Sequence, residues 1–235
     1  MLPWQTIDSL ETPEGRLELR RRGKDSFLIT IGGRVLMTSA AHRSESALAH
    51  RACQPIASRP RPHLLLGGLG MGYTLRAALD ELPKKARVTV VELNRAVVAW
   101  CRGPLEGLSN KGLADARVTT VVDDVSRVIT RARPASFDAI VLDLYEGPHH
   151  ATNRADDPLY GAAALERAEA ALCAGGVLAI WSEERDRAFE VRLAAAGFTV
   201  GRLPGGRGGR SHTIYLGTKL ARTEKPAALA KKRRR

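Results

Sequence analysis

The first feature that could take part in binding or catalysis is a glycine-rich segment, GGLGMG at residues 67–72. It lies between a short apolar run and a helical pattern. Glycines let a backbone turn tightly and approach a ligand closely, and a helix that begins there offers free N–H groups. We therefore interpret Gly68, Gly70, Met71 and Gly72 as contacts of a bound nucleoside. Many nucleotide sites share such a loop, so this segment alone does not identify the ligand.

Acidic residues end the next three apolar runs of the chain. Glu92 lies about 20 residues after the glycine segment, where a carboxylate accepts hydrogen bonds from a ribose diol. Asp123 and Asp124 follow another apolar run and suit the amino group of an adenine. Asp143 ends the last of these runs. The carboxyl ends of parallel strands meet at one edge of a sheet, so these acids are expected to surround one ligand.

The order of these features is more specific than any one of them. A glycine loop followed by a ribose acid is shared with NAD-binding Rossmann domains. An NAD site gives no reason for acids at Asp124 and Asp143 as well. We therefore predict a site for an S-adenosyl-type nucleoside.

An alternating pattern of strands and helices between residues 59 and 218 positions these residues. Apolar strands are expected at 64–66, 88–91, 118–122, 139–142 and 177–181, separated by helices at 74–82, 95–102, 125–132, 162–172 and 187–196. Such alternation is typical of a parallel sheet covered by helices on both faces. Strands at 199–203 and 213–216, joined by a glycine-rich turn, are expected to form an antiparallel edge hairpin. The prediction is an α/β, methyltransferase-like Rossmann domain over 59–218.

Residues 1–58 are predicted to form a smaller unit. Segments 16–20, 27–31 and 34–37 read as a small antiparallel β-meander. A helix over 42–57 follows, with Ser44 as its candidate N-cap. The prolines of Arg59-Pro60-Arg61-Pro62 then predict a stiff linker to the larger domain.

Charge is concentrated at the end of the sequence. The 235 residues carry a net charge of +12, and from Lys219 onward there are eight basic residues and one acid. We interpret 219–235 as a disordered basic tail that makes at most weak, nonspecific contact with nucleic acid. Cys53, Cys101 and Cys173 are too few and too scattered for a disulfide framework or a zinc site. With no apolar run of bilayer length and an acidic beginning, a cytoplasmic protein without a membrane partner is expected.

Four motifs together make residues 14–218 resemble the spermidine synthase (polyamine aminopropyltransferase) family. They are LGGLGMGYTLR at 66–76, VVELN at 90–94, DDV at 123–125 and FDAIVLDLYEGP at 137–148. That family pairs a small N-terminal β-domain with a methyltransferase-like Rossmann domain. The chain is most similar to short, divergent bacterial proteins of this group.

The resemblance implies roles for individual residues. Glu92 would hold the ribose and Asp124 the adenine of an S-adenosyl donor. Asp143 would orient or deprotonate the acceptor amine, and Glu146 would replace the family's second, amine-binding acid. From its position, Tyr145 is expected to pack over the sulfonium or an alkylammonium by a cation–π contact.

Several positions depart from the family pattern. Met71 stands where the family usually has an aspartate that binds the amine of the aminopropyl group. Leu48 and Ala49 stand where tyrosine and histidine are usual, and Trp181-Ser182 replaces a segment that contains glutamine. The motifs that would contact the nucleoside are therefore kept, whereas positions that would contact the amine groups are changed.

Three functions follow as alternatives. The first is transfer of an aminopropyl or related alkyl group from decarboxylated S-adenosylmethionine or S-adenosylmethionine to a small, polyamine-like amine, without a metal. The second is an S-adenosylmethionine-dependent methyltransferase, which the loss of an acid at Met71 favours. The third is a non-catalytic nucleoside-binding protein whose basic tail touches nucleic acid. The family commonly dimerises, so the resemblance also implies a homodimer.

Overall fold

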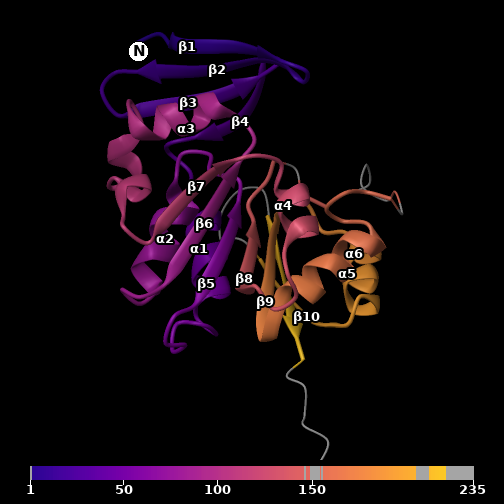
Figure 1. Cartoon of the computed structure of the whole chain (residues 1–235). Coiled ribbons are helices and arrows are strands. Elements are labelled where there is room, and N and C mark those ends of the chain that lie inside the picture. The colour runs from indigo at the N-terminus through magenta and orange to yellow at the C-terminus, as the bar shows by residue number, and fades with distance from the viewer. Residues whose placement is uncertain (1, 146, 149–153, 155, 205–211, 221–235) are drawn as a thin grey trace, which may run out of the picture.

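The computed structural model describes residues 2–145, 147–148, 154, 156–204 and 212–220. Within them, a four-stranded sheet lies above a seven-stranded sheet that carries helices on both sides (Figure 1). This is the predicted α/β architecture with an N-terminal antiparallel sheet. No helix among these residues is long and apolar enough to cross a membrane.

The seven-stranded sheet has the order β10-β11-β9-β8-β5-β6-β7. Its strands are β5 (His63–Gly67), β6 (Arg87–Glu92), β7 (Val118–Val122), β8 (Phe137–Leu142), β9 (Leu172–Ser182), β10 (Phe198–Pro204) and β11 (Thr213–Lys219). β5 to β9 run parallel, and β11 pairs antiparallel with both β9 and β10. The mostly parallel sheet and its antiparallel hairpin at the edge are thus confirmed. The chain order reverses between β5 and β8, which makes their carboxyl ends the switch point where ligands bind in open α/β sheets.

The central strands supply two separate apolar cores by simple alternation. Leu64 and Leu66 of β5 point into one core, whereas Leu65 points into the other. The first core packs under α1 (Arg43–Cys53), α2 (Tyr73–Glu81) and α3 (Arg95–Arg102). The second packs under α4 (Val125–Arg131), α5 (Ala162–Ala171) and α6 (Arg187–Ala195). Burial on both faces explains why these strands are continuous apolar runs in the sequence.

The N-terminal sheet is a meander of four strands rather than three. β1 (Gln5–Thr12), β2 (Gly15–Arg22), β3 (Ser26–Ile31) and β4 (Arg34–Thr38) pair in chain order, all antiparallel. The sequence did not predict β1, which carries polar residues at most positions. It is anchored by its pairing with β2 and by the Trp100 indole, whose Nε1 donates to Asp8 Oδ2 at 2.6 Å.

The two sheets share one apolar core. Leu17 and Ile29 from the N-terminal sheet belong to the same buried cluster as Val90 of β6. α1 packs on α2 and on β8 and β9, so this helix of the N-terminal segment covers the large sheet. Ser44 was expected to cap α1, but the helix begins at Arg43 with His42 at the N-cap, and no side chain caps it. Ser44 Oγ instead donates to Glu45 Oε2 at 2.6 Å.

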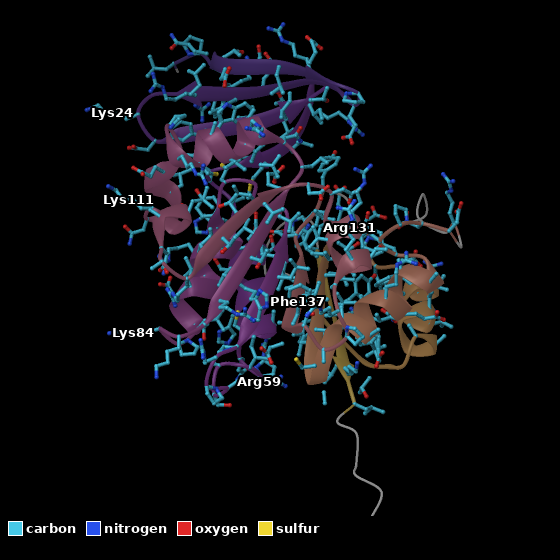
Figure 2. The ribbon with its side chains drawn as sticks, viewed as in Figure 1. Lys24, Arg59, Lys84, Lys111, Arg131 and Phe137 are labelled. Atoms are coloured by element: carbon cyan, nitrogen blue, oxygen red, sulfur yellow. The ribbon has the colours of Figure 1, made fainter. Side chains whose placement is uncertain are left out.

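Two short 3₁₀ turns, Glu106–Ser109 and Gly112–Ala114, connect α3 to β7. Lys111, between them, extends outward from the molecule, as do Lys24 and Lys84 at other turns (Figure 2). These three lysines therefore lie on separate turns of the chain.

Candidate active site

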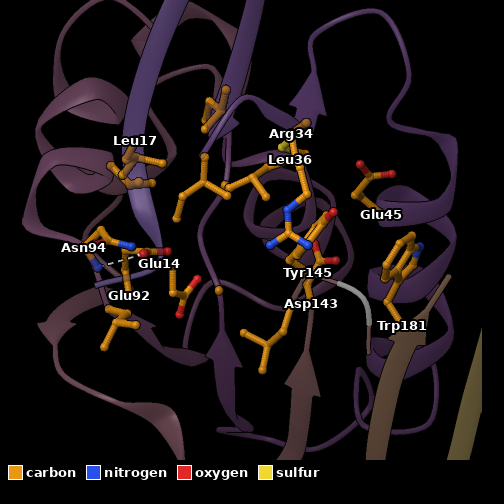
Figure 3. Close-up of a pocket in the computed structure, with 18 residues that line it drawn as sticks. Glu14, Leu17, Arg34, Leu36, Glu45, Glu92, Asn94, Asp143, Tyr145 and Trp181 are labelled. Carbon is orange, nitrogen blue, oxygen red and sulfur yellow. Dashed lines mark hydrogen bonds between the residues drawn. The ribbon is translucent and has the colours of Figure 1, made fainter. Parts of the chain in front are cut away.

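A pocket of about 580 Å³ lies between the N-terminal sheet and the carboxyl ends of the parallel strands (Figure 3). Its floor is built from strand ends at the switch point, including Gly68, Glu92 and Asp143. Its roof consists of apolar side chains of the upper sheet, namely Leu17, Ile29, Ile31, Leu36 and Met37. The volume falls within the range of typical small-molecule sites, about 300–1,000 Å³.

The glycine loop brings its backbone against the end of β8. Gly68 has a φ of +89°, and a Cβ at this residue would overlap the carbonyl oxygen of Asp143. The Asp143 N–H in turn donates to Gly67 O at 2.9 Å. Only glycine allows both the left-handed conformation and this close approach. The loop and the end of β8 are thereby held together at the floor of the pocket.

Glu92 is the last residue of β6 and is 8% exposed. Its Oε2 accepts from the Leu69 N–H and its Oε1 from the Asn94 N–H, each at 2.9 Å. Burial raises the pKa of Glu92, and hydrogen bonds from surrounding backbone N–H groups oppose that rise. The backbone N–H groups of Leu93 and Gly70 add to these two, so the glycine loop and the end of β6 together hold the carboxylate at the floor of the pocket.

Asp143 directly follows β8 and lines the pocket beside the glycine loop. The Thr74 hydroxyl, at the start of α2, donates to Asp143 Oδ2. The pKa of Asp143 is raised to about 7, mainly by burial and also by the charge of Glu45, against the lowering effect of the Thr74 hydrogen bond. A carboxyl group with a pKa near neutrality can hold or release a proton under physiological conditions.

Tyr145 and Arg34 form the open side of the pocket. The Tyr145 side chain is 43% exposed, and the Arg34 guanidinium carbon lies 5.5 Å from the centroid of its ring. Figure 3 shows the Arg34 side chain reaching from β4 toward Tyr145. Glu45 of α1 and Trp181 of β9 lie beyond the Tyr145 ring, on the side away from Arg34. The pocket thus contains both acids and a guanidinium.

Three of the predicted nucleoside contacts have other neighbours. The Met71 side chain is fully buried in the first apolar core, and its N–H donates to the sulfur of Met37 at 3.3 Å. Asp124 is the N-cap of α4, where its Oδ1 accepts from the Ser126 N–H at 2.8 Å. Asp123 Oδ1 accepts from the Asp124 N–H at 2.8 Å. None of the three belongs to the lining of the pocket as the described residues form it.

The other predicted residues lie in or near the pocket. Gly68, Gly70, Glu92, Asp143 and Tyr145 all line it. Gly72 is the N-cap of α2, with a φ of +83°. Glu146 lies outside the described residues.

The sequence missed several residues of the site. Thr74 was noted only as part of a motif, although its hydroxyl contacts Asp143. Glu14, in the turn between β1 and β2, and Arg34, directly after a glycine pair, also line the pocket. The only indication in the sequence that Glu14 and Arg34 could belong to a site was their position in hairpins. Such connecting segments often carry binding residues.

Residues 42–186 match the spermine/spermidine synthase domain family. The polyamine aminopropyltransferase of Mycobacterium tuberculosis is 31% identical over 162 residues, which cover 68% of this chain and 29% of that protein. The chain therefore spans less than a third of the length of this curated relative.

Solved structures share the fold. Spermidine synthase from Thermotoga maritima superposes with a TM-score of 0.72 at 19% identity, over 91% of this chain and 72% of that one. A spermidine synthase in complex with the transition-state analogue AdoDATO gives a TM-score of 0.70 at 18% identity, with the same coverage. At these identities the likeness establishes the architecture, including the pairing of the two sheets.

Proposed function

The chain belongs to the spermine/spermidine synthase family, and on that premise we propose that it transfers an aminopropyl or related alkyl group from an S-adenosyl sulfonium donor to a small amine. The observation that carries the proposal is Asp143, a carboxyl group with a pKa near 7 at the switch point of the sheet, beside a glycine loop. The curated relative is a polyamine aminopropyltransferase, which supports the same class of reaction.

The nucleoside end of the donor would lie along the glycine loop and β6. Glu92 lines the pocket, and its carboxylate would accept hydrogen bonds from the ribose hydroxyls in place of, or shared with, some of its backbone N–H donors. Leu93, which is 61% exposed and lines the pocket directly after Glu92, offers an apolar surface to the base. Asp124 does not line the pocket, so the adenine amino group would have to extend past the lining to reach the Asp124 oxygen that does not cap α4.

The transfer itself needs little covalent chemistry from the protein. The lone pair of the acceptor nitrogen attacks the carbon next to the sulfonium, and the carbon–sulfur bond breaks. Its electron pair returns to sulfur, so a neutral thioether nucleoside leaves. The nitrogen passes one proton to Asp143, whose raised pKa makes it a competent acceptor near neutral pH. Positioning both reactants in one pocket supplies the rest of the rate enhancement.

Thr74 and Tyr145 would assist in different ways. The Thr74 hydroxyl occupies one oxygen of Asp143 and thereby turns the other toward the pocket. Tyr145 would place its ring over the sulfonium or the alkylammonium, a contact worth about 0.5–2 kcal/mol. Glu146 would bind the amine of the acceptor.

Methyl transfer from S-adenosylmethionine is the second candidate, and the placement of Met71 favours it. The position that bears an amine-binding aspartate in the family carries here a side chain that is fully buried in the core. At the position of Met71 the protein therefore offers no carboxylate that could bind the amine of the donor's aminopropyl group.

One product analysis separates the candidates. The purified protein would be incubated with putrescine and either donor, and the nucleoside products identified by mass spectrometry. Aminopropyl transfer releases methylthioadenosine, whereas methyl transfer releases S-adenosylhomocysteine. If neither appears with putrescine or with longer amines while methylthioadenosine still binds, the result favours a non-catalytic nucleoside-binding protein.

Paired variants test the role of Asp143. Asp143→Asn should abolish product formation with either donor. Asp80→Asn is the matched control, because Asp80 lies on the exposed side of α2 with a side chain that is 66% exposed. Unchanged turnover in Asp143→Asn would refute the proposed mechanism.

A further inference from the structure

The ends of three strands lie in a fixed order across the floor of the pocket. The sheet order β9-β8-β5-β6 places Glu92 at the end of β6, Asp143 directly after β8 and Trp181 on β9. Neighbouring strands of a sheet lie about 4.8 Å apart. Glu92, assigned to the nucleoside, is therefore on one side of Asp143, and Trp181 is on the other. An acceptor that reacts beside Asp143 has the β9 side of the pocket for the rest of its length.

Trp181 and Asp143 lie at the same level and on the same face of the sheet. Leu142 of β8 pairs in register with Ile180 of β9, so the residues that follow them, Asp143 and Trp181, are neighbours across the two parallel strands. Trp181 packs against the apolar core under α1, α2 and α3, and Thr74 of α2 contacts Asp143 from that same side. Both side chains line the pocket.

Glu45 of α1 covers this end of the pocket. α1 packs on both β8 and β9, and Glu45 lies in its first turn, where the positive end of a helix favours a charged carboxylate. Ser44 Oγ donates to Glu45 Oε2 at 2.6 Å, and the charge of Glu45 raises the pKa of Asp143. Figure 3 shows Glu45 and Trp181 on the same side of the Tyr145 ring. One acid and two aromatic rings thus lie beyond Asp143.

These groups suit an alkylammonium. A carboxylate accepts charge-assisted hydrogen bonds from an ammonium, and an aromatic ring attracts a cation within about 6 Å of its centroid. Acids also outnumber cations in the described lining, which holds Glu14, Glu45, Glu92 and Asp143 against Arg34. A pocket with this excess of negative charge favours a ligand that carries more than one positive charge.

From this geometry we infer that Glu45 and Trp181 form a subsite for a second ammonium of the acceptor. The reacting nitrogen lies at Asp143, and the far ammonium pairs with Glu45 beside the Trp181 ring. The inference rests on the proposed function and specifies its acceptor, which is a diamine or a longer amine rather than a monoamine. Glu45 and Trp181 then determine which amine binds, whereas the transfer step itself stays with Asp143.

Putrescine and butylamine provide the test, because they share a carbon chain and differ in the second amine. Their dissociation constants would be measured by calorimetry on protein saturated with methylthioadenosine, which fills the nucleoside side of the pocket, and again on the protein alone. Decarboxylated S-adenosylmethionine would be titrated separately. A pH of about 8.5 keeps Asp143 largely ionised in every variant, since its pKa is about 7.

The variants are Glu45→Gln, Trp181→Leu and Trp181→Phe. Glu166→Gln is the matched control, because Glu166 is an exposed acid on α5 and is not part of the pocket lining. Trp181→Phe keeps an aromatic ring and so separates the contact with a cation from simple loss of packing. Binding of methylthioadenosine by each variant shows that its pocket is still formed.

In the parent protein we expect putrescine to bind more tightly than butylamine. Glu45→Gln should weaken putrescine about tenfold and leave butylamine within about twofold, because one charge-assisted hydrogen bond is lost. Trp181→Leu should weaken putrescine about threefold, whereas Trp181→Phe should stay close to the parent. Glu166→Gln should change neither constant.

Equal binding of the two amines to the parent, or equal weakening of both by Glu45→Gln, would overturn the inference. A loss of affinity in Glu45→Gln that is confined to decarboxylated S-adenosylmethionine would also overturn it, because Glu45 would then bind the amine of the donor. Methylthioadenosine has no ammonium and checks the proposed function separately. If it does not bind, the proposed nucleoside site is wrong, and the two amines on the protein alone still decide the role of Glu45.

Discussion

The hydrogen bond from Thr74 to Asp143 should control the pH at which the protein works. Thr74 is 2% exposed, and its hydroxyl donates to Asp143 Oδ2. This bond lowers the pKa of Asp143, whereas burial raises it, and the result is a pKa of about 7. Thr74→Val keeps the shape and volume of the side chain but removes the donor, so the pKa of Asp143 should rise.

The size of the change follows from the strength of the bond. A hydrogen bond to a charged group contributes about 1.5–3 kcal/mol, and about 1.4 kcal/mol corresponds to one pKa unit. Taking the lower end, the pKa of Asp143 should move from about 7 to about 8. At pH 6 the proton-accepting form, and with it kcat/KM, should fall roughly tenfold below the parent value. At pH 9.5 both proteins have an ionised Asp143, so their rates should agree within about twofold.

The assay is the release of nucleoside product between pH 5.5 and 9.5 with a fixed amine. At each pH the rate of the variant would be divided by the rate of the parent protein. This ratio cancels the effect of titrating the acceptor amine, which is the same for both proteins. Thr74→Ser keeps the hydroxyl and should follow the parent profile. A constant ratio across the whole pH range would show that Thr74 only supports the fold, and the reasoning about Asp143 would be refuted.

Three further predictions follow from the same geometry. Gly68→Ala should lower the free energy of unfolding in urea by at least about 3 kcal/mol, because its Cβ would overlap the Asp143 carbonyl. Gly33→Ala, with a φ of +79° but open space around its Cβ, should cost about 1–2 kcal/mol, and equal costs would contradict the steric argument. The folded pKa of Asp143 lies above its unfolded value of 3.8, so ionisation of this carboxyl destabilises the fold progressively as pH rises from about 4 to 7. Asp143→Asn should therefore melt at the same temperature as the parent at pH 3.5 and at a higher temperature at pH 8. Equal melting temperatures at pH 8 would show that burial of the ionised Asp143 does not destabilise the fold. Deletion of residues 221–235, which removes seven basic residues, should leave turnover intact and reduce salt-sensitive binding to a DNA oligonucleotide, whereas loss of turnover would assign these residues to the active site.

The large sheet could be predicted from the sequence because both of its faces are buried. A strand such as β8 then consists almost entirely of apolar residues and ends abruptly at a polar one, Asp143. The acids at strand ends could therefore be found from the sequence alone. β1 could not, because Ile7 and Leu10 are only partly buried and its position depends on pairing with β2. Such pairing is a long-range property that local periodicity does not contain.

The glycine loop shows a second limit of sequence-based prediction. Met71 was expected to contact the ligand because it lies inside a nucleoside motif. Its neighbours Gly70 and Gly72 both have positive φ values, +51° and +83°, so the chain reverses direction around it. The side chain of Met71 consequently points into the apolar core. Spacing predicts that a residue lies near a site, but only the backbone conformation determines on which side its side chain lies.

The floor and the upper part of the pocket have different structural constraints. The floor is made of strand ends and a loop without room for a Cβ at Gly68, so a change there also disturbs the sheet. The upper part combines buried apolar residues of the N-terminal sheet with polar residues at its turns, and substitutions at the exposed turn positions cost less stability. Leu48 and Ala49 of α1 are fully buried, so they contribute to the core rather than to the lining of the pocket. The polar side chains above the floor include Glu14 and Arg34 of the N-terminal sheet and its turns, and Glu45 of α1. Substrate preference in this fold should therefore depend on such residues more than on conservative substitutions in the floor of the pocket.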